Sequence, residues 1–442
     1  MSILLDILYA LGLILASPMW IYRMVRQGRY RKDLGQRFGA APINYSRQPS
    51  IWIHGVSLGE INAARALVAE IHDQLPDYRV CVSTTTATGM EAAKKHFAPD
   101  HVVFRWPLDF SFAVRRALKR VDPELVVLME GEIWPNFLTA CGKRGVKTCI
   151  VNARISPDKG YPRYRKLGPL AGWLFNKLDR IGCQSTTYAE LYESLGVEPR
   201  KVKVTGMLKF DSAPVDQQIP GQDALAGQLG IGDDDRLLVA GGTGPGEETM
   251  LLEVYPTLKA DAPALRLAIV PRKPERFDEV ARLIEQAGHR CIRRSRHAAD
   301  SPAEHDPDAV ILGDTMGELR KFYALADLVF VGRSLVPMGG SDMIEAAALG
   351  KPTAFGPHTF NFPQADDLAA NGCARVADCQ QLTALLAQWL ADPDAAASAG
   401  TAAQQFVRDN QGATRANVAM ICDMLGRQAA AAPGTIATQK LA

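Results

Sequence analysis

Carboxylates follow two apolar segments that predict buried strands. Glu60 ends the motif HGVSLGE (54–60), after the segment Ser50–His54, and Glu130 opens the motif EGEIWPN (130–136), after the segment Leu125–Met129. Glu130 and Glu132 follow their strand directly, and burying an unpaired carboxylate is costly, so these two acids are either capped by neighbouring groups or face a polar site. The structural alternative for Glu60 is that it complements the dipole of a helix that begins near Ile61.

Basic residues mark two further segments of the N-terminal half. Lys209 lies in the motif GMLKFD (206–211), where it either serves a charged substrate or is a solvated lysine. Basic and aromatic residues mix between positions 154 and 175, a pattern typical of surfaces that bind single-stranded nucleic acid or an anionic lipid headgroup. The apolar N-terminus favours lipid over nucleic acid. The acceptor-binding candidates are Ser57, Arg154, Lys159, Arg163 and Arg165.

Four motifs of the C-terminal half also lie after predicted strands. The loop GGTGPGEE (241–248) is rich in glycine but lacks the GK[ST] of a Walker loop. A basic residue in PRKPERF (271–277) can face a phosphate, and DTMGEL (314–319) opens a helix whose N–H groups can do the same. In GGSDMIEAAALGKP (339–352), a tight loop explains the glycine pair but not Glu345, whose carboxylate can accept the hydroxyls of a ribose.

Short apolar segments alternate with amphipathic stretches, which predicts parallel sheets with helices on both faces. The expected strands are Ser50–His54, Tyr78–Ser83, Val102–Trp106, Leu125–Met129, Thr148–Asn152, Ile181–Cys183, Val202–Thr205, Arg236–Ala240, Leu265–Val270, Arg290–Arg293, Ala309–Leu312, Leu328–Val331 and Pro352–Phe355. The polar stretch 211–235 separates two series of strands. We therefore expect an anchor at 1–25, domains at 26–210 and 236–428, a linker at 211–235 and a flexible tail at 429–442.

Composition excludes several classes of protein. The chain has 442 residues, 47% of them hydrophobic, which is enough for two domains with separate cores. A formal net charge of +2 argues against general nucleic-acid binding. The eight cysteines form no CxxC pair and no zinc-ligand spacing with histidines. They predict small core residues in a reducing compartment, without a structural metal or disulfides.

The N-terminus is apolar from Ile3 to Val25 and leads into a basic collar, in which Asp33 is the only acid, of Arg23, Arg26, Arg29, Arg31, Lys32 and Arg37. About twenty apolar residues can span a bilayer, and a basic collar keeps the downstream chain in the cytoplasm. The order of the two segments is opposite to that of a signal peptide. A buried helix of a soluble domain is one alternative. Asp6 and Pro18 also leave open a helix that lies among the lipid headgroups.

Six motifs, in this order, resemble those of the 3-deoxy-D-manno-octulosonic acid (Kdo) transferases: HGVSLGE, EGEIWPN, GMLKFD, PRKPERF, DTMGEL and GPHTFNF. The resemblance covers essentially the whole chain and implies a GT-B fold, with two Rossmann-like domains facing a central cleft. It implies CMP-Kdo as donor, lipid IVA or a related lipid A precursor as acceptor, and neither metal nor other cofactor. The implied location is the inner membrane of a Gram-negative-type bacterium, in contact with its phospholipids and facing the cytoplasm.

Matched motif by motif, the resemblance makes Glu60 the general base, and makes Glu130 and Lys209 groups that stabilise the transition state. It places the donor on Pro271, Arg272, Met316, Gly317, Glu318, Gly339, Gly340, Asp342, Met343, Ile344 and Glu345. The family usually has His-Asn after the glycine pair, whereas this chain has Ser341-Asp342. The loop GGTGPGEE also differs from the usual loop, which contains serine and histidine. An extra acid beside an anionic donor is electrostatically unfavourable, so these departures question the local donor contacts.

The family's reaction is an inverting displacement that needs one base on the attacking face. The nearest alternative is another GT-B enzyme that uses a UDP-sugar and a lipid acceptor. A UDP-sugar epimerase of the same fold would not need the anchor. An alternative from a different class is a catalytically inactive membrane scaffold. Such a scaffold would bind a nucleotide tightly but would transfer no sugar to any acceptor.

Overall fold

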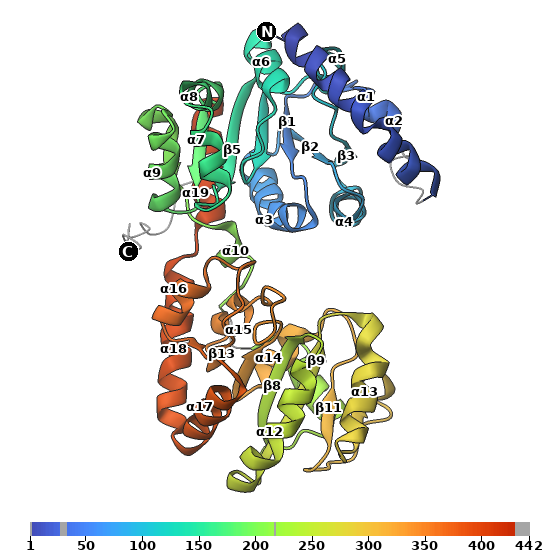
Figure 1. The fold of residues 1–442 in the computed structure, drawn as a ribbon, viewed down its shortest axis with the longest axis vertical. Coiled ribbons are helices and arrows are strands. Elements are labelled where there is room, and N and C mark those ends of the chain that lie inside the picture. The colour runs from blue at the N-terminus through green and yellow to red at the C-terminus, as the bar shows by residue number, and fades with distance from the viewer. Residues whose placement is uncertain (1, 27–32, 216–217, 429–442) are drawn as a thin grey trace. The chain divides into compact units, whose positions relative to one another are not determined.

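The computed structural model of the protein describes residues 2–26, 33–215 and 218–428. The chain forms two compact units, one of Met1–Ser212 with Asn410–Ala442 and one of Ala213–Asp409. Both have the predicted class, a parallel sheet with helices (Figure 1). The predicted tail at 429–442 and the collar positions 27–32 lie outside the described residues.

The first unit is built on a parallel sheet of order β3-β2-β1-β4-β5-β6-β7. Its strands are β1 Ser50–His54, β2 Arg79–Thr84, β3 Val102–Arg105, β4 Leu125–Met129, β5 Lys147–Ala153, β6 Arg180–Cys183 and β7 Val202–Val204. Its helices are α1 Ser2–Arg26, α2 Leu34–Arg37, α3 Leu58–Gln74, α4 Ala87–Phe97, α5 Ser111–Val121, α6 Pro135–Arg144, α7 Gly160–Arg165, α8 Pro169–Phe175, α9 Thr186–Ser194, α10 Leu208–Asp211 and α19 Ala413–Leu425. Every residue of β1 and β4 is buried, as expected for strands covered on both faces.

The second unit repeats this plan with a parallel sheet of order β10-β11-β9-β8-β12-β13-β14. Its strands are β8 Arg236–Thr243, β9 Leu265–Pro271, β10 Cys291–Arg293, β11 Val310–Leu312, β12 Leu328–Val331, β13 Thr353–Phe355 and β14 Ala374–Arg375. Its helices are α11 Gln222–Gln228, α12 Glu247–Asp261, α13 Phe277–Gln286, α14 Leu319–Leu325, α15 Ile344–Ala348, α16 Ala365–Ala370, α17 Cys379–Ala391 and α18 Pro393–Asp409.

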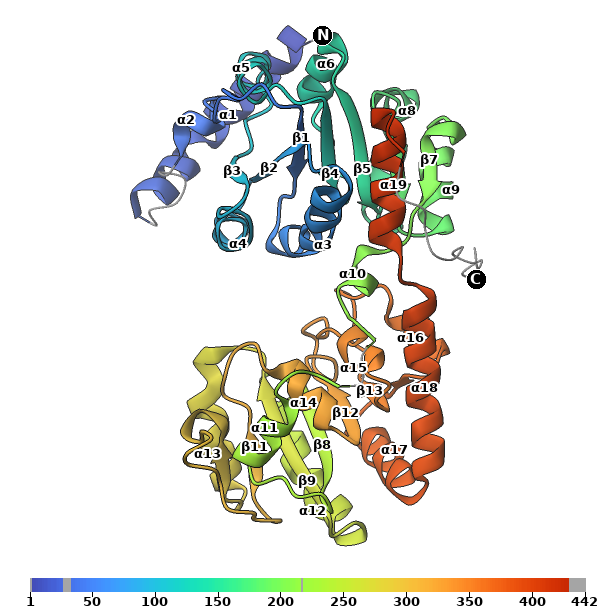
Figure 2. The same cartoon turned by 180° about the vertical axis from the view of Figure 1, so that it is seen from behind.

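The C-terminal helix α19 packs on the first unit, so the prediction of a second domain extending to residue 428 is wrong. Its buried residues Ala413, Val418 and Ile421 share a core cluster with Ile51 of β1. Both views show α19, in red, beside the first sheet (Figures 1 and 2). Hydrophobic periodicity predicts a helix with an apolar face, but it does not identify the sheet that receives this face.

The stretch 211–235, predicted as a linker, contains ordered elements. Asp211 ends α10, and its carboxylate accepts hydrogen bonds from the backbone N–H of Gly412 (2.6 Å) and Thr414 (2.5 Å). Residues from Ala213 onward belong to the second unit and include α11. The chain thus passes between the units twice, and Asp211 ties the two passages together on the side of the first unit.

Each sheet has a topological switch point, where the chain changes its direction of winding. Apart from the edge strands β7 and β10, both sheets have the doubly wound order 3-2-1-4-5-6. The switch point lies between β1 and β4 in the first unit and between β8 and β12 in the second. Ligands of such sheets bind outside the carboxyl ends of these strands, so the loops after them are the candidate sites.

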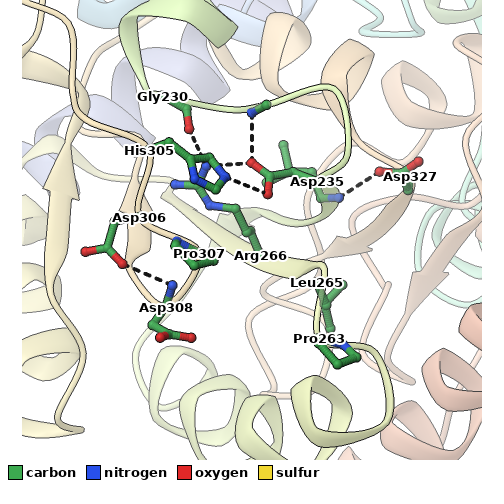
Figure 3. A network of polar contacts seen from close by, with 12 residues as sticks. Gly230, Asp235, Pro263, Leu265, Arg266, His305, Asp306, Pro307, Asp308 and Asp327 are labelled. Carbon is green, nitrogen blue, oxygen red and sulfur yellow. Dashed lines mark hydrogen bonds and ion pairs between the residues drawn. The ribbon is translucent and has the colours of Figure 1, made fainter.

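A buried ion pair lies in the second unit (Figure 3). The side chain of Arg266 on β9 is fully buried, and its Nη1 donates to the carboxylate of Asp235 (2.8 Å) and the carbonyl of Gly230 (2.6 Å). Asp235 also accepts from the N–H of Gly232 (2.8 Å), and its other oxygen lies 3.1 Å from Nε2 of His305. Among the described residues, Nε and Nη2 of Arg266 have no hydrogen-bond partner. Asp235 is therefore the carboxylate that compensates this buried cation.

Candidate active site

Glu60 lies at the switch point of the first sheet, in the first turn of α3. Its carboxylate accepts hydrogen bonds from the N–H of Val56 (2.8 Å), the N–H of Ser57 (3.2 Å) and the hydroxyl of Ser57 (2.7 Å). The same hydroxyl accepts from the N–H of Glu60 (3.3 Å), which completes a capping box. Glu60 therefore has a structural role at the helix start. Ser57, which was predicted to bind the acceptor substrate, is hydrogen-bonded to Glu60.

Three carboxylates influence one another at this end of the sheet. Burial raises the pKa of Glu60 above its usual value, the charge of Glu130 raises it further, and the hydrogen bonds from Val56 and Ser57 act in the opposite direction. Glu132 is exposed overall, but its carboxylate is partly shielded from water. This desolvation, together with the charge of Glu60, raises the pKa of Glu132 to about 7. A raised pKa suits a group that takes up a proton near neutral pH.

Glu130 follows β4 in a strained conformation, with φ at 63°. Its N–H donates to the carbonyl of Val151 (3.0 Å), and its carbonyl accepts from the N–H of Arg154 (2.9 Å). Nε of Arg154 also donates to its carboxylate (3.1 Å). Arg154, predicted to contact the acceptor, thus holds Glu130 through backbone and side chain. A non-glycine residue in this region costs about 1–3 kcal/mol, and such strain is concentrated at functional sites.

Lys209 lies on α10, and a residue that the sequence analysis missed fixes the start of this helix. Oδ1 of the buried Asn152 accepts a hydrogen bond from the N–H of Leu208 (3.1 Å). Asn152 lies near the carboxyl end of β5 with φ at 54°, a conformation that asparagine adopts more readily than most residues. α10 also contacts α3, the helix that carries Glu60. The sequence did offer one signal for this role, because Asn152 is a polar residue at the carboxyl end of the predicted strand Thr148–Asn152.

The remaining acceptor candidates lie on the segment after β5. Lys159, Arg163 and Arg165 are exposed there. A hollow of about 310 Å³ is lined by Tyr161, Pro162, Arg165 and Lys166. A second hollow of the first unit, about 550 Å³ between α3 and α4, contains none of the predicted site residues. The structure therefore places a cationic surface after β5.

The glycine pair follows β12 at the switch point of the second sheet. Gly339 and Gly340 have φ values of 88° and 86°. A Cβ atom on Gly339 would lie 2.0 Å from Nδ2 of Asn361, and one on Gly340 would lie 3.2 Å from the ring of Phe362. The N–H of Asn361 also donates to the carbonyl of Gly339 (3.2 Å). The GPHTFNF segment therefore packs directly on the pair, and both conformation and contact require glycine.

The two departures from the family pattern contact each other. The hydroxyl of the buried Ser341 donates to the carbonyl of Gly242 (2.8 Å), and a Cβ atom on Gly242 would lie 2.6 Å from that hydroxyl. A larger residue at either position would therefore require a change at the other. Oδ1 of Asp342 accepts from the N–H of Ile344 (3.1 Å). Met343 and Ile344, predicted to bind the donor, are buried as whole residues.

Three of the residues predicted to bind the donor act electrostatically on a tyrosine that was not predicted. Tyr323 of α14 is fully buried, and a Cβ atom on Gly241 would lie 2.2 Å from its hydroxyl. Burial raises its pKa, the charges of Glu345 and Asp342 raise it further, and Arg272 acts in the opposite direction. Among the described residues its hydroxyl has no hydrogen-bond partner. The apolar pattern of α14 gave no sign that this residue borders the site.

The motifs after β9 and β11 each contain exposed residues as well as residues that are buried or hydrogen-bonded within the protein. Pro271 is buried at the end of β9, and Arg272 after it is exposed. Met316 is 64% exposed and Gly317 has φ at 86°, whereas Glu318 is bonded within the protein. Its carboxylate accepts from Oγ1 of Thr315 (2.5 Å), Nε of Arg294 (3.0 Å) and Nζ of Lys321 (3.3 Å). Burial acts to raise the pKa of Glu318, but these contacts hold it below its usual value.

Glu247 joins the two loops of the second switch point, a role that the sequence analysis missed. Its fully buried carboxylate accepts from the N–H of Gly244 (2.9 Å), Arg333, Ser334 (2.8 Å) and Leu335 (2.9 Å). A carboxylate that accepts several backbone hydrogen bonds is a rigid junction. It therefore positions the segment that leads to the glycine pair.

Histidine and cysteine do not form a metal site in the described part of the chain. No three His, Cys, Asp or Glu side chains lie close enough there to hold a metal ion. All eight cysteines are free, and most are buried as predicted. His54 of the HGVSLGE motif stacks on Trp106, with 3.8 Å between ring centroids, and burial lowers its pKa to about 3. It is therefore a neutral core residue.

Known proteins resemble this chain in sequence and in fold. Residues 32–212 match the model of the 3-deoxy-D-manno-octulosonic-acid transferase (kdotransferase) family. The 3-deoxy-D-manno-octulosonic acid transferase of Haemophilus influenzae is 35% identical over 77% of this chain and 78% of its own length. That of Bordetella pertussis is 34% identical over 95% and 99%. A glycosyltransferase structure from Rickettsia africae covers 86% of this chain and 99% of its own, with a TM-score of 0.58 and 13% identity. This last likeness concerns the fold alone.

Proposed function

Because the chain belongs to the 3-deoxy-D-manno-octulosonic acid transferases, we propose that it transfers Kdo from CMP-Kdo to lipid IVA or a related lipid A precursor. The family makes it a glycosyltransferase of lipopolysaccharide synthesis. We place the reaction at the cytoplasmic face of the inner membrane. The apolar helix Ser2–Met19, long enough to cross a membrane, and the basic collar support this location. We expect transfer without a metal ion.

The observation that carries the mechanism is the buried Glu60 at the switch point of the first sheet, with its pKa raised. In the proposed step, the acceptor's primary hydroxyl oxygen forms a bond to the anomeric carbon of Kdo. The bond from that carbon to the phosphate oxygen of CMP breaks, and Glu60 takes the hydroxyl proton. One carboxylate on the attacking face is sufficient for this inversion.

Glu130 and Lys209 are proposed to stabilise the charges that develop in this step. The transition state has positive character at the sugar ring, and the carboxylate of Glu130, held by Arg154 at 3.1 Å, is a fixed negative charge in the same loop cluster. Lys209, on the helix positioned by Asn152, and the exposed Arg272 would offset the charge of the leaving phosphate. Fixed cations can perform this role in place of a metal ion.

The donor is proposed to bind at the second switch point. The glycine pair with its positive φ values lets a ligand approach the backbone closely. Glu345, in the first turn of α15, would accept the ribose hydroxyls. Its charge acts on Tyr323, whose buried hydroxyl has no hydrogen-bond partner within the described part of the chain. Gly317 and Met316 would contact the nucleotide from the loop after β11. The exposure of Met316 and the positive φ of Gly317 support this contact.

The proposal is tested with the purified full-length chain, a tetraacylated lipid A precursor and CMP-Kdo made immediately beforehand, with EDTA added in excess. The lipid product is measured by mass spectrometry. We expect a gain of one or more Kdo masses, and product formed at least ~10²-fold more slowly by Glu60→Gln in the same preparation. A folded protein that transfers a sugar from a UDP-sugar, but not Kdo from CMP-Kdo, would overturn the donor assignment. A loss of transfer that Mg²⁺ restores would overturn metal independence.

A further inference from the structure

The apolar helix α1 lies along the first unit, and residues near the N-terminal end of the helix form hydrogen bonds with that unit. The carboxylate of Asp6 accepts hydrogen bonds from the N–H (2.8 Å) and hydroxyl (2.5 Å) of Ser111, the first residue of α5. It also accepts from Nδ2 of Asn136 on α6 (3.0 Å). Both views show α1 beside α5, along the flank of the unit (Figures 1 and 2). The carboxylate of the single acid in this apolar helix is thus hydrogen-bonded to the body of the protein.

A second contact one turn later repeats this arrangement. The hydroxyl of Tyr9 donates to the carboxylate of Asp109 (3.2 Å), and its ring meets that of Phe110 edge to face at 6.1 Å. The carboxylate of Asp109 also accepts from the N–H groups of Asn136 (3.0 Å) and Phe137 (2.8 Å), at the start of α6. Asp6 and Tyr9 therefore form one polar clamp, which joins a single face of α1 to the starts of α5 and α6.

The helix is continuous from this clamp to the basic collar. Pro18 has no N–H to donate to the carbonyl of Ile14, but the hydroxyl of Ser17 donates to that carbonyl (2.7 Å). α1 therefore runs unbroken for 25 residues, about 37 Å at 1.5 Å per residue. Asp6 and Arg26 are twenty residues apart, or about 30 Å, which is the thickness of a bilayer's hydrocarbon core.

Apart from the clamped face, the surface of α1 between Ser2 and Met19 is apolar and open. None of the stretch Ser2–Met19 is buried. Exposed fractions lie between 37% and 82% for Ile3, Leu4, Ile7, Leu8, Leu11, Leu13, Ile14, Leu15 and Met19. Phe112 of α5 and Phe38, half-exposed and stacked at 6.3 Å, extend this surface beyond α1. A continuous apolar surface of this kind marks an interaction site.

Cations border the apolar surface on α5. Phe112, Arg115, Arg116 and Lys119 follow the spacing of one helical face, and all four are exposed. Arg26 is exposed at the C-terminal end of α1. Apolar residues flanked by Lys and Arg are the pattern of a surface that binds acyl chains beneath anionic headgroups.

We propose that α1 lies in the plane of the membrane surface, with its open face among the acyl chains of an anionic leaflet and its clamped face on the protein. The choice of membrane rests on the proposed function. A spanning helix would carry Asp6 about 30 Å from the collar, to the far side of the bilayer. Asp6 could not then bind Ser111 and Asn136, which lie beside the cationic face of α5.

The orientation is tested with spin labels on the full-length chain in vesicles of phosphatidylethanolamine and phosphatidylglycerol. Cysteines replace Leu4, Leu8, Leu11 and Leu15, one at a time, with Glu193→Cys on the exposed side of α9 as a water-phase control. Accessibility to oxygen and to a water-soluble nickel complex gives the depth of each label. We expect four equal depths within about 5 Å and high oxygen accessibility. Depths that change steadily, by about 16 Å between positions 4 and 15, would overturn the proposal.

Two variants test the clamp. The double variant Asp6→Ala/Tyr9→Phe removes the hydrogen bonds of the clamp and should spread the four depths, whereas Asp77→Ala, on an exposed turn, should leave them equal. Equal depths in the double variant would show that the clamp does not set the orientation. Low accessibility to both reagents would mean that a second copy of the chain covers the face. Kdo transfer is assayed in the same vesicles, so an active enzyme with spread depths refutes the orientation alone, and an inactive enzyme with equal depths refutes the function alone.

Discussion

Replacing Glu60 by Gln removes the proposed base but retains much of the helix cap. An amide keeps one acceptor oxygen, so it can hold the hydrogen bonds from Ser57 or that from Val56, but not both. Losing one such bond should lower the free energy of unfolding by about 1–2 kcal/mol. Losing general-base catalysis should lower turnover at least ~10²-fold, which corresponds to about 2.7 kcal/mol of activation free energy. The change in turnover should therefore greatly exceed the change in folded population.

Ser57→Ala is the matched control, because it damages the same cap and keeps the carboxylate. It removes two hydrogen bonds between Ser57 and Glu60, at a cost of about 1 kcal/mol. The hydroxyl of Ser57 lowers the pKa of Glu60, so its loss should raise that pKa further. A base must be deprotonated to act. Ser57→Ala should therefore lose activity as the pH falls and recover it as the pH rises, whereas Glu60→Gln should not recover.

The assay measures kcat and kcat/KM for Kdo transfer over a range of pH, with product counted by mass spectrometry. Circular dichroism and hydrogen exchange of α3 report whether each variant is folded. A folded Glu60→Gln with turnover within about tenfold of the wild type would refute the reasoning, because removing a general base has a larger effect. A pH response shared by the two variants would also refute it.

Three further perturbations test other contacts. Glu130→Gln removes a charge that raises the pKa of Glu60, so the acid limb of the kcat/KM profile should move to lower pH; an unmoved limb contradicts the coupling. Asp235→Ala leaves the buried Arg266 guanidinium unpaired and should cost about 3–5 kcal/mol in urea denaturation, and a cost below about 1 kcal/mol contradicts this. Burial raises the pKa of Asp109 from 3.8 to about 6, so its stabilising contribution should be lost as the pH rises through that range. Thermal unfolding should show this slope, and Asp109→Asn should flatten it.

The strands were predictable where they are long and buried on both faces. The segments Ser50–His54, Leu125–Met129 and Leu328–Val331 were predicted with the bounds that the structure has, because continuous apolar runs between turn residues leave few alternatives. β14 was missed, since Ala374–Arg375 is a pair without an apolar run. The assignment of α19 failed for a different reason, because its partner strand β1 is more than 350 residues away in the chain.

The loops of the site were predictable, but the contacts that shape them were not. Glu60 and Glu130 were found because each follows an apolar segment that predicts a buried strand, and the resemblance to the Kdo transferases gave each of them a role. The bonds from Asn152 to α10, and from Glu247 to the loop after β12, join side chains to distant backbone groups. Such bonds leave no periodic pattern in the sequence. The pairing of Ser341 with Gly242 is visible only in three dimensions, although both departures were visible separately.

The return of α19 to the first unit determines the order in which the two units can be completed during synthesis. The second unit, Ala213–Asp409, is continuous in the chain, so its core can close once Asp409 has left the ribosome. The first unit must wait, because Val418, Ile421 and Met424 of α19 fill the core cluster that contains β1. The half that is translated first is therefore completed last. Its open apolar core, as well as α1, is then available to chaperones or to the membrane while the ribosome is still at work.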